Sequence, residues 1–156
     1  MKYKAYLALL FVTSPLNAKG ENISVVTELD FGTVELSPST SGSVSITALG
    51  EESASNVTLI KNPTNGNYTI SCAETTGNIT IDLNISSTPQ GITLPHLEIF
   101  YKDTSYSDSD FPASGLANPG TGTSLLVGGT MSLSSATPGT YAPEVEIKLT
   151  CPDPPT

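Results

Sequence analysis

Apolar and polar residues alternate along most of this chain, and the alternation is most regular near residue 150. Between residues 138 and 151, one parity carries the apolar residues and the other carries glutamate, lysine and threonine. The apolar set consists of Tyr141, Val145, Ile147, Leu149 and Cys151. Successive side chains leave a β-strand on opposite sides, so this pattern predicts a half-buried antiparallel strand. Cys151 is in phase with the apolar residues, and we therefore expect its sulfur to face the core.

Shorter stretches of the same kind predict about nine strands, separated by turn signals, as in a Greek-key sandwich. Outside the first dozen residues no window shows a sustained helical period. The chain is therefore expected to form one all-β domain. The predicted strands cover residues 22–34, 43–48, 56–62, 67–72, 79–85, 97–103, 124–127, 130–133 and 138–151.

Glycine, proline and asparagine mark the expected turns. Asn65-Gly66 predicts a tight hairpin between residues 56–62 and 67–72. Gly128-Gly129 predicts a second two-residue hairpin, and Gly32 permits a bulge or kink in the first strand. The polar segment from Thr104 to Gly122 is expected to be the longest irregular loop, and loops of that length are often functional.

The first eighteen residues follow the pattern of a secretory signal peptide. Lys2 and Lys4 give a positive start, residues 5–12 are uncharged and mostly apolar, and the segment ends in the small residue Ala18. We expect cleavage after Ala18, which leaves a domain of residues 19–156. A retained anchor is the alternative, but the apolar run is shorter than the roughly 20 residues that span a bilayer.

The charge of the chain argues against some partner classes. There is no arginine, and removal of Lys2 and Lys4 would change the formal net charge from -9 to -11. Nucleic acids and anionic membranes require clustered basic residues, so both are unfavourable partners. Only 13% of residues are charged, which leaves a surface of serine, threonine and asparagine that suits exposed strands.

Cys72 and Cys151 are the only cysteines of the chain. Two cysteines in an exported protein usually pair, and Cys72 shares its parity with the apolar Tyr68 and Ile70. A two-cysteine metal site would need further ligands, and no histidine cluster or second cysteine pair is present. We therefore expect one structural disulfide between Cys72 and Cys151.

Candidate chemistry is sparse. His96 is the only histidine, and no nucleophile-elbow glycine pattern accompanies it, so we expect no enzyme and no cofactor. Asp103, Asp108 and Asp110 are the candidate metal ligands, because hard cations such as calcium take carboxylate oxygens. Their spacing does not match an EF-hand loop, and a solvated loop is the alternative.

Three aromatic residues flank the same segment: Tyr101, Tyr106 and Phe111. They are the candidate contacts for a sugar or a protein, because aromatic rings combine apolar area with polar edges. The alternative, which we favour, is a small cluster that holds the segment against the domain.

The sequence also resembles a known family. The motifs are Leu29 to Val34, Leu126 to Leu133, and Pro138-Gly139-Thr140-Tyr141 before the last strand. They resemble a bacterial family of exported, pilin-like proteins catalogued as domain of unknown function 4402. The last strand is also similar to that of fimbrial subunits assembled by the chaperone–usher route. Ala142-Pro143 stands where the family often has Ser-Gly, and proline cannot donate a ladder hydrogen bond, which predicts an edge or bulge there.

The resemblance implies an Ig-like or pilin-like Greek-key β-sandwich and a fimbrial-subunit-like protein. Together with the signal, it predicts a structural or adhesive protein that is periplasmic, secreted or on the cell surface. The expected partners are further copies of the chain, other surface subunits and a periplasmic chaperone. The alternative is a stand-alone secreted module that binds a glycan or a calcium-dependent partner through residues 104–122.

Overall fold

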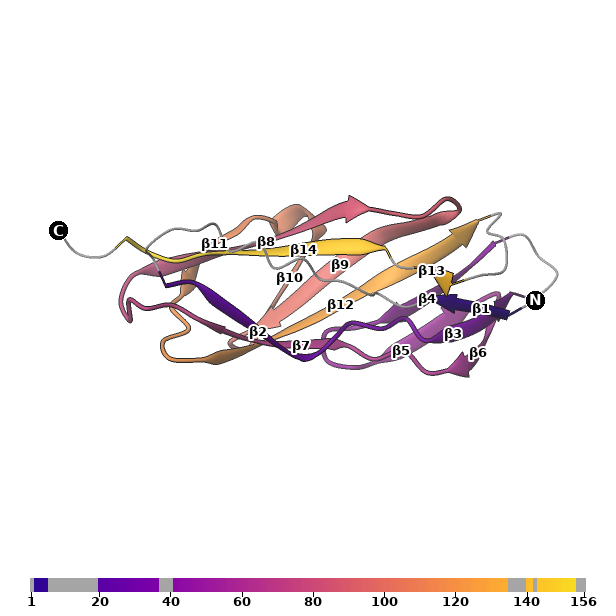
Figure 1. Cartoon of the computed structure of the whole chain (residues 1–156), viewed down its shortest axis with the longest axis horizontal. Helices are drawn as coiled ribbons and strands as arrows, with labels where there is room; N and C mark the ends of the chain where they lie inside the picture. Colours follow the sequence, from indigo (N-terminus) through magenta and orange to yellow (C-terminus); the bar gives the residue numbers. More distant parts are fainter. Residues whose placement is uncertain (1, 6–19, 37–40, 135–139, 142, 154–156) are drawn as a thin grey trace.

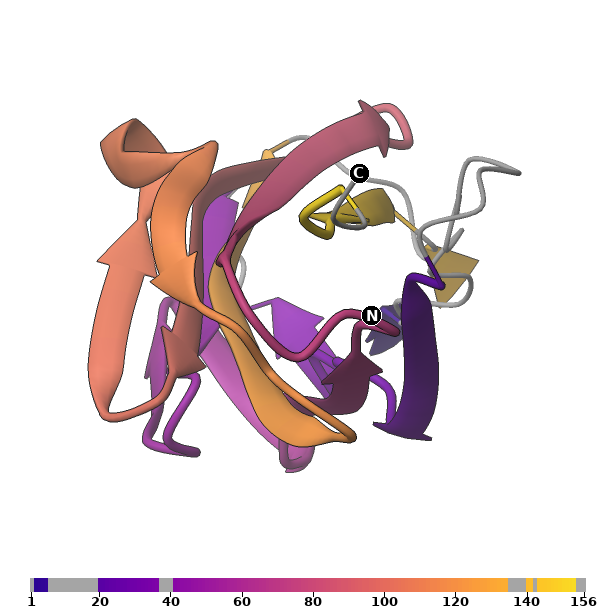
Figure 2. The ribbon, with the colours of Figure 1, turned by 90° about the vertical axis from the view of Figure 1, so that its left-hand side faces the viewer.

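The computed structural model describes residues 2–5, 20–36, 41–134, 140–141 and 143–153. Within these residues every regular element is a β-strand except one 3-10 turn, which confirms the all-β prediction. Most strands run roughly along the long axis of an elongated molecule (Figure 1). Viewed from one end, they surround a common interior, which gives a sandwich-like arrangement (Figure 2).

The elements, in chain order, have the following bounds. They are β1 (Lys2–Ala5), β2 (Asn22–Thr27), β3 (Thr33–Leu36), β4 (Ser41–Ile46), β5 (Glu52–Ser55), β6 (Val57–Lys61), β7 (Gly66–Ser71), β8 (Asn78–Ser87), β9 (Ile92–Tyr101), β10 (Thr104–Ser107), η1 (Asp108–Asp110), β11 (Ala113–Ala117), β12 (Thr123–Ser134), β13 (Thr140–Tyr141) and β14 (Glu144–Thr150).

The largest sheet is organised around β12. One edge of β12 pairs with β9, and β10 continues the sheet beyond β9. The other edge is shared: the first half of β12 pairs with β7, and the second half pairs with β4. β2 then pairs with β7, and β5 pairs with β4. A single long strand therefore joins six others, directly or through a neighbour.

Two smaller sheets complete the structure. One has the order β11–β8–β14, and the other has the order β13–β1–β3–β6. All strand pairs are antiparallel apart from β1 with β13. Because β13 leads directly into β14, the last part of the chain connects these two sheets.

The core is built from inward-facing residues of all three sheets. In β14, Val145, Ile147 and Leu149 are buried, whereas Lys148 and Thr150 are exposed, as the alternation predicts. The largest fully buried side chains come from β7, β8, β9, β12 and the segment before β3. They are Tyr68, Tyr101, Phe31, Leu29, Ile70, Ile79, Ile81, Ile92, Ile99, Leu125, Met131 and Leu133.

The predicted hairpin at Gly128-Gly129 is wrong, because β12 runs straight through both residues. Gly128 lies where the neighbour of β12 changes from β7 to β4: Val127 pairs with Gly66, and Gly129 pairs with Ile46. A Cβ at Gly128 would lie 2.3 Å from the backbone nitrogen of Ala48. The glycine is therefore needed for a close backbone approach and not for a turn.

The predicted hairpin at Asn65-Gly66 is also wrong. β6 pairs with β3, whereas β7 pairs with β12 and β2, so the segment between β6 and β7 crosses from one sheet to another. Asn65 has a long-range role in this crossing, because its Nδ2 donates a hydrogen bond to the carbonyl oxygen of Ala48 at 2.6 Å. An Asn-Gly pair fits a tight turn locally. Here, however, β6 and β7 each pair with other strands and not with one another, and this pairing decides the topology.

Two further predictions concern irregular segments. The first predicted strand is divided into β2 and β3, and Gly32 between them has φ +79°, so the expected kink is confirmed. The stretch from Thr104 to Gly122 is not an irregular loop: it contains β10, η1 and β11. The strand β10 was hidden because it is an edge strand of polar residues, in which only Tyr106 packs against the core.

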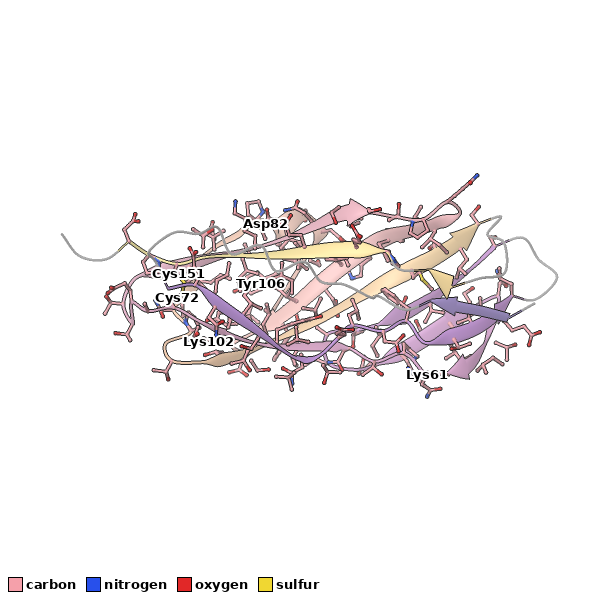
Figure 3. The ribbon with its side chains drawn as sticks, in the orientation of Figure 1. Lys61, Cys72, Asp82, Lys102, Tyr106 and Cys151 are labelled. Carbon is pink, nitrogen blue, oxygen red and sulfur yellow. A yellow bond between two sulfur atoms is a disulfide. The ribbon has the colours of Figure 1, made fainter. Side chains whose placement is uncertain are left out.

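The disulfide between Cys72 and Cys151 is confirmed, with a Cα–Cα distance of 5.8 Å. Both cysteines are buried, and they lie at one end of the long axis (Figure 3). The bond follows β7 and β14 directly, so it connects the largest sheet to the sheet of β8. The last predicted strand is divided into β13 and β14, and Pro143, where we expected an edge or bulge, lies between them; residues 138 and 139 lie outside the described residues.

Replacement of Gly128 by alanine tests the close approach at the junction. We expect Gly128→Ala to lower the free energy of unfolding by about 1–3 kcal/mol, as other overpacked sites do. Urea denaturation measures the change. Ser134→Ala, at an exposed position of the same strand, is the matched control. Equal unfolding free energies for the two variants would contradict the role assigned to Gly128.

Removal of the disulfide tests its contribution to stability. The bond closes a loop of 79 positions, so in the chain-entropy account its loss should cost on the order of 4 kcal/mol. We expect the Cys72→Ala/Cys151→Ala variant and the reduced wild-type protein to show the same loss in denaturant unfolding. A cost below about 1 kcal/mol in both would contradict this prediction.

Candidate functional site

The three candidate aromatic residues are directed inward. Tyr101 is buried, and its hydroxyl donates a hydrogen bond to the carbonyl oxygen of Ala117 at 2.6 Å. Burial raises the pKa of Tyr101 to about 12. Tyr106 and Phe111 are partly buried and pack against the core. These aromatics hold β10, η1 and β11 against the sandwich, which matches the alternative that we favoured.

The candidate metal ligands Asp103, Asp108 and Asp110 have separate surroundings. Asp103 lies in the turn between β9 and β10, with φ +64°. Asp108 Oδ1 accepts a hydrogen bond from the backbone of Leu97 at 3.0 Å, and Asp110 Oδ2 accepts one from Ser107 at 2.9 Å. Among the residues that the structure describes, no group of three or more histidine, cysteine or acidic side chains is arranged to hold a metal ion.

Instead, Asp108 belongs to a cluster around His96. His96 Nδ1 lies 2.5 Å from Asp108 Oδ2, and His96 Nε2 lies 3.5 Å from Glu98 Oε2. Glu98 Oε1 also accepts a hydrogen bond from Ala48 at 2.6 Å. Through Asp108, the cluster connects β9 to η1. Through Glu98, it connects β9 to the turn at Ala48, which lies against Gly128.

Glu98, the third member of this cluster, was not among the residues predicted from the sequence. His96 and Glu98 have the same parity on β9, with the buried Leu97 between them, so the alternation contained a signal for their proximity. Asp108 had no such signal. It comes close only because β10 pairs with β9 and returns the chain along it.

The pKa values of the cluster shift in opposite directions. Burial by itself would lower the pKa of His96, but the hydrogen bond and charge of Asp108, followed by those of Glu98, outweigh it and raise the pKa above 6.5. For Asp108, burial acts to raise the pKa. The hydrogen bond from Leu97 and the contact with His96 outweigh this effect and lower it. Both shifts favour the charged pair.

Exposed apolar side chains are concentrated on a few strands. In β2, Val25 and Val26 are 48% and 62% exposed, and only Ile23 packs against the core. Among the residues that the structure describes, β2 pairs only with β7, and a register shift leaves Val26 without a partner position on β7. β2 lies at the rim of the structure (Figure 2). The other exposed large apolar residues are Leu49, Ile60 and Ile85.

The strand β1 has an unusual position. It lies between β3 and β13, antiparallel to the first and parallel to the second. Lys4 occupies the register position opposite both Thr33 and Thr140. Residues 2–5 belong to the segment that we expect to be removed on export, so the structure places part of the predicted signal peptide inside a sheet.

The described residues contain no helix with the length and apolarity needed to cross a bilayer.

Comparison with known proteins gives one match. The model of a family described as Domain of unknown function (DUF4402) matches residues 22–150. No curated protein and no solved structure matches the chain.

The raised pKa of His96 predicts a pH-dependent stability. Protonated His96 favours the folded state, so its contribution is complete below pH 6.5 and is lost as the pH rises through the raised folded-state pKa. Asp108 contributes above its ordinary pKa of 3.8, and that contribution is lost as the pH falls through the lowered value. The pair should therefore stabilise most between these two ordinary values.

We expect the pH effect to be about 1 kcal/mol or less, because the two side chains are 39% and 51% exposed. Urea unfolding from pH 5 to 9 measures it, and His96→Ala should remove the step. Since His96 is the only histidine, an NMR titration of its ring reports the pKa directly. A pKa at or below 6.5 would contradict the prediction.

Proposed function

Because the chain belongs to the family described as Domain of unknown function (DUF4402), whose description names no activity, we propose its function from its surface: it is an exported structural or adhesive protein that acts by association with other protein subunits. In this proposal it resembles a fimbrial subunit. The Cys72–Cys151 disulfide is compatible with an oxidising compartment, and the predicted signal peptide supports export.

The observation that carries the proposal is the edge strand β2. It pairs with β7 on one side and exposes Val25 and Val26. An exposed apolar edge strand favours pairing with another chain, because it combines unpaired backbone groups with apolar area. Association along β2 would bury both valines.

The alternative, a binding module that uses residues 104–122, draws less support. Tyr101, Tyr106 and Phe111 pack inward, and the carboxylates of Asp108 and Asp110 accept hydrogen bonds from the backbone. The proposal also assigns no catalytic role. Both ring nitrogens of His96 face carboxylates, which leaves neither nitrogen positioned to activate a nucleophile.

Substitution of the exposed valines tests the proposed association. We expect the exported wild-type protein to self-associate or to be recovered with material sheared from the cell surface. Val25→Lys/Val26→Lys should weaken self-association by about tenfold or more, since each buried valine contributes about 1.5 kcal/mol. Light scattering coupled to size-exclusion chromatography measures self-association.

Leu49→Lys is the matched control, because Leu49 and Val26 are both 62% exposed but Leu49 lies in a turn. It should leave association unchanged. A wild-type protein that stays monomeric at high concentration and is absent from sheared surface material would overturn the proposal. Equal weakening by Leu49→Lys would show that the association does not depend on β2.

A further inference from the structure

Asn65 and Gly66 form the only Asn-Gly pair of the chain, and both residues have structural roles. Asn65 Nδ2 donates a hydrogen bond to the carbonyl oxygen of Ala48 at 2.6 Å, and Ala48 is only 2% exposed. A Cβ at Gly66 would lie 2.7 Å from the ring of Tyr68, which is fully buried. Asn65 is therefore needed for a contact and Gly66 for close packing.

The same pair is chemically reactive. In an Asn-Gly sequence, the backbone nitrogen of the glycine can attack Cγ of the asparagine side chain. The new N–C bond closes a succinimide ring, and the side-chain nitrogen leaves as ammonia, which takes the proton that the backbone nitrogen loses. Water then opens the ring at either carbonyl, which gives aspartate or isoaspartate. Glycine favours the attack because it has no side chain to hinder it and because its backbone has wide conformational freedom.

The folded chain restrains both reacting groups. Thr64, which precedes the pair, exchanges two backbone hydrogen bonds with Asp30, at 2.8 and 2.6 Å. Gly66 begins β7, is buried, and is paired in register with β12. The side-chain amide of Asn65 is directed to Ala48. Attack on Cγ requires rotation about the backbone and side-chain bonds of Asn65, and these contacts oppose that rotation.

We propose that Asn65 is a modification site. It loses ammonia by attack of the Gly66 nitrogen when the start of β7 separates from β12, and it is protected while these strands are paired. A chain that remains unfolded is therefore modified at this position, whereas a folded chain is not. The reaction consumes only water. The proposal does not depend on the function proposed above.

The product cannot replace Asn65 in the folded structure. Aspartate at this position has no N–H donor, so the carbonyl of Ala48 would lose this hydrogen bond and would face a carboxylate. Isoaspartate also adds a methylene group to the main chain between the Thr64–Asp30 bridge and β7. Because the backbone of Ala48 lies against Gly128, either product should destabilise the junction at which β12 changes its neighbour.

The rate of conversion in the wild-type protein tests the protection. The disulfide-bonded chain is incubated at mildly alkaline pH, either folded in buffer or unfolded in guanidinium chloride. It is then reduced and digested with trypsin, and the peptide of residues 62–102 is analysed by mass spectrometry with fragmentation. We expect Asn65 to convert at least about tenfold faster in the unfolded chain, because conversion of the folded chain requires local opening.

Asn67 is the matched control, because it lies in the same peptide but is followed by the bulky Tyr68. It should remain largely unconverted over the same period, folded or unfolded. Equal rates for Asn65 in the folded and unfolded chains would overturn the protection. Equal rates for Asn65 and Asn67 in the unfolded chain would overturn the assignment of the site.

Asn65→Asp imitates one product and tests its effect on the fold. Relative to the wild-type protein at the same pH, its unfolded fraction at neutral pH should rise by about tenfold or more, because a buried acceptor loses its donor. Below about pH 4 the carboxyl group is protonated and offers a donor to Ala48 again, so the loss should shrink there. Guanidinium unfolding at the two pH values measures the change.

Asn65→Ala, which lacks the donor at every pH, is the control for this variant, and its loss should not shrink in acid. Wild-type stability of Asn65→Asp at neutral pH would overturn the effect assigned to the modification, as would the same pH dependence in both variants. If Asn65→Asp does not fold at neutral pH, the conversion rates of the wild-type protein still test the site.

Discussion

The close approach of the turn at Thr47 and Ala48 to Gly128 is the contact on which the arrangement of the largest sheet depends. It lets β12 remain one continuous strand while its neighbour changes from β7 to β4. Both backbone polar groups of Ala48 are satisfied by side chains, since its N–H donates to Glu98 and its carbonyl accepts from Asn65. Where two strand ladders meet in the interior, the junction is stable only when its buried backbone polar groups have hydrogen-bond partners.

The turn at Ala48 also connects the largest sheet to the charged cluster of His96, Glu98 and Asp108. Glu98 contacts Ala48 through one oxygen and His96 through the other, so the turn over β12 and the segment of η1 belong to one hydrogen-bonded network. We interpret this cluster as structural, because it fixes neighbouring segments and because its carboxylates are engaged within it. The exposed valines of β2, on which the proposed association rests, lie outside this cluster.

The two ends of the molecule differ in what holds the sheets together. At one end, the Cys72–Cys151 disulfide connects them covalently, and Glu21 accepts a hydrogen bond from the backbone of Cys151 at 3.2 Å. At the other end, β1 pairs with both β13 and β3. The disulfide and β1 lie toward opposite ends of the long axis (Figures 1 and 3).

The sequence by itself determined the faces of the strands and the covalent link. The alternation in β7, β8 and β14 predicted which side chains are buried, apart from Ile85, which is 44% exposed, and it placed both cysteines inward, because side-chain direction along a strand is a local property. Only the tertiary structure decided which strands are neighbours and which polar residues meet. In the sequence, Gly128 and Asn65 are as compatible with a turn as with the contacts that they make to Ala48. Asp108 reaches His96 only through the pairing of β10 with β9. Strand pairing joins residues that are distant in the sequence, so no local pattern specifies it.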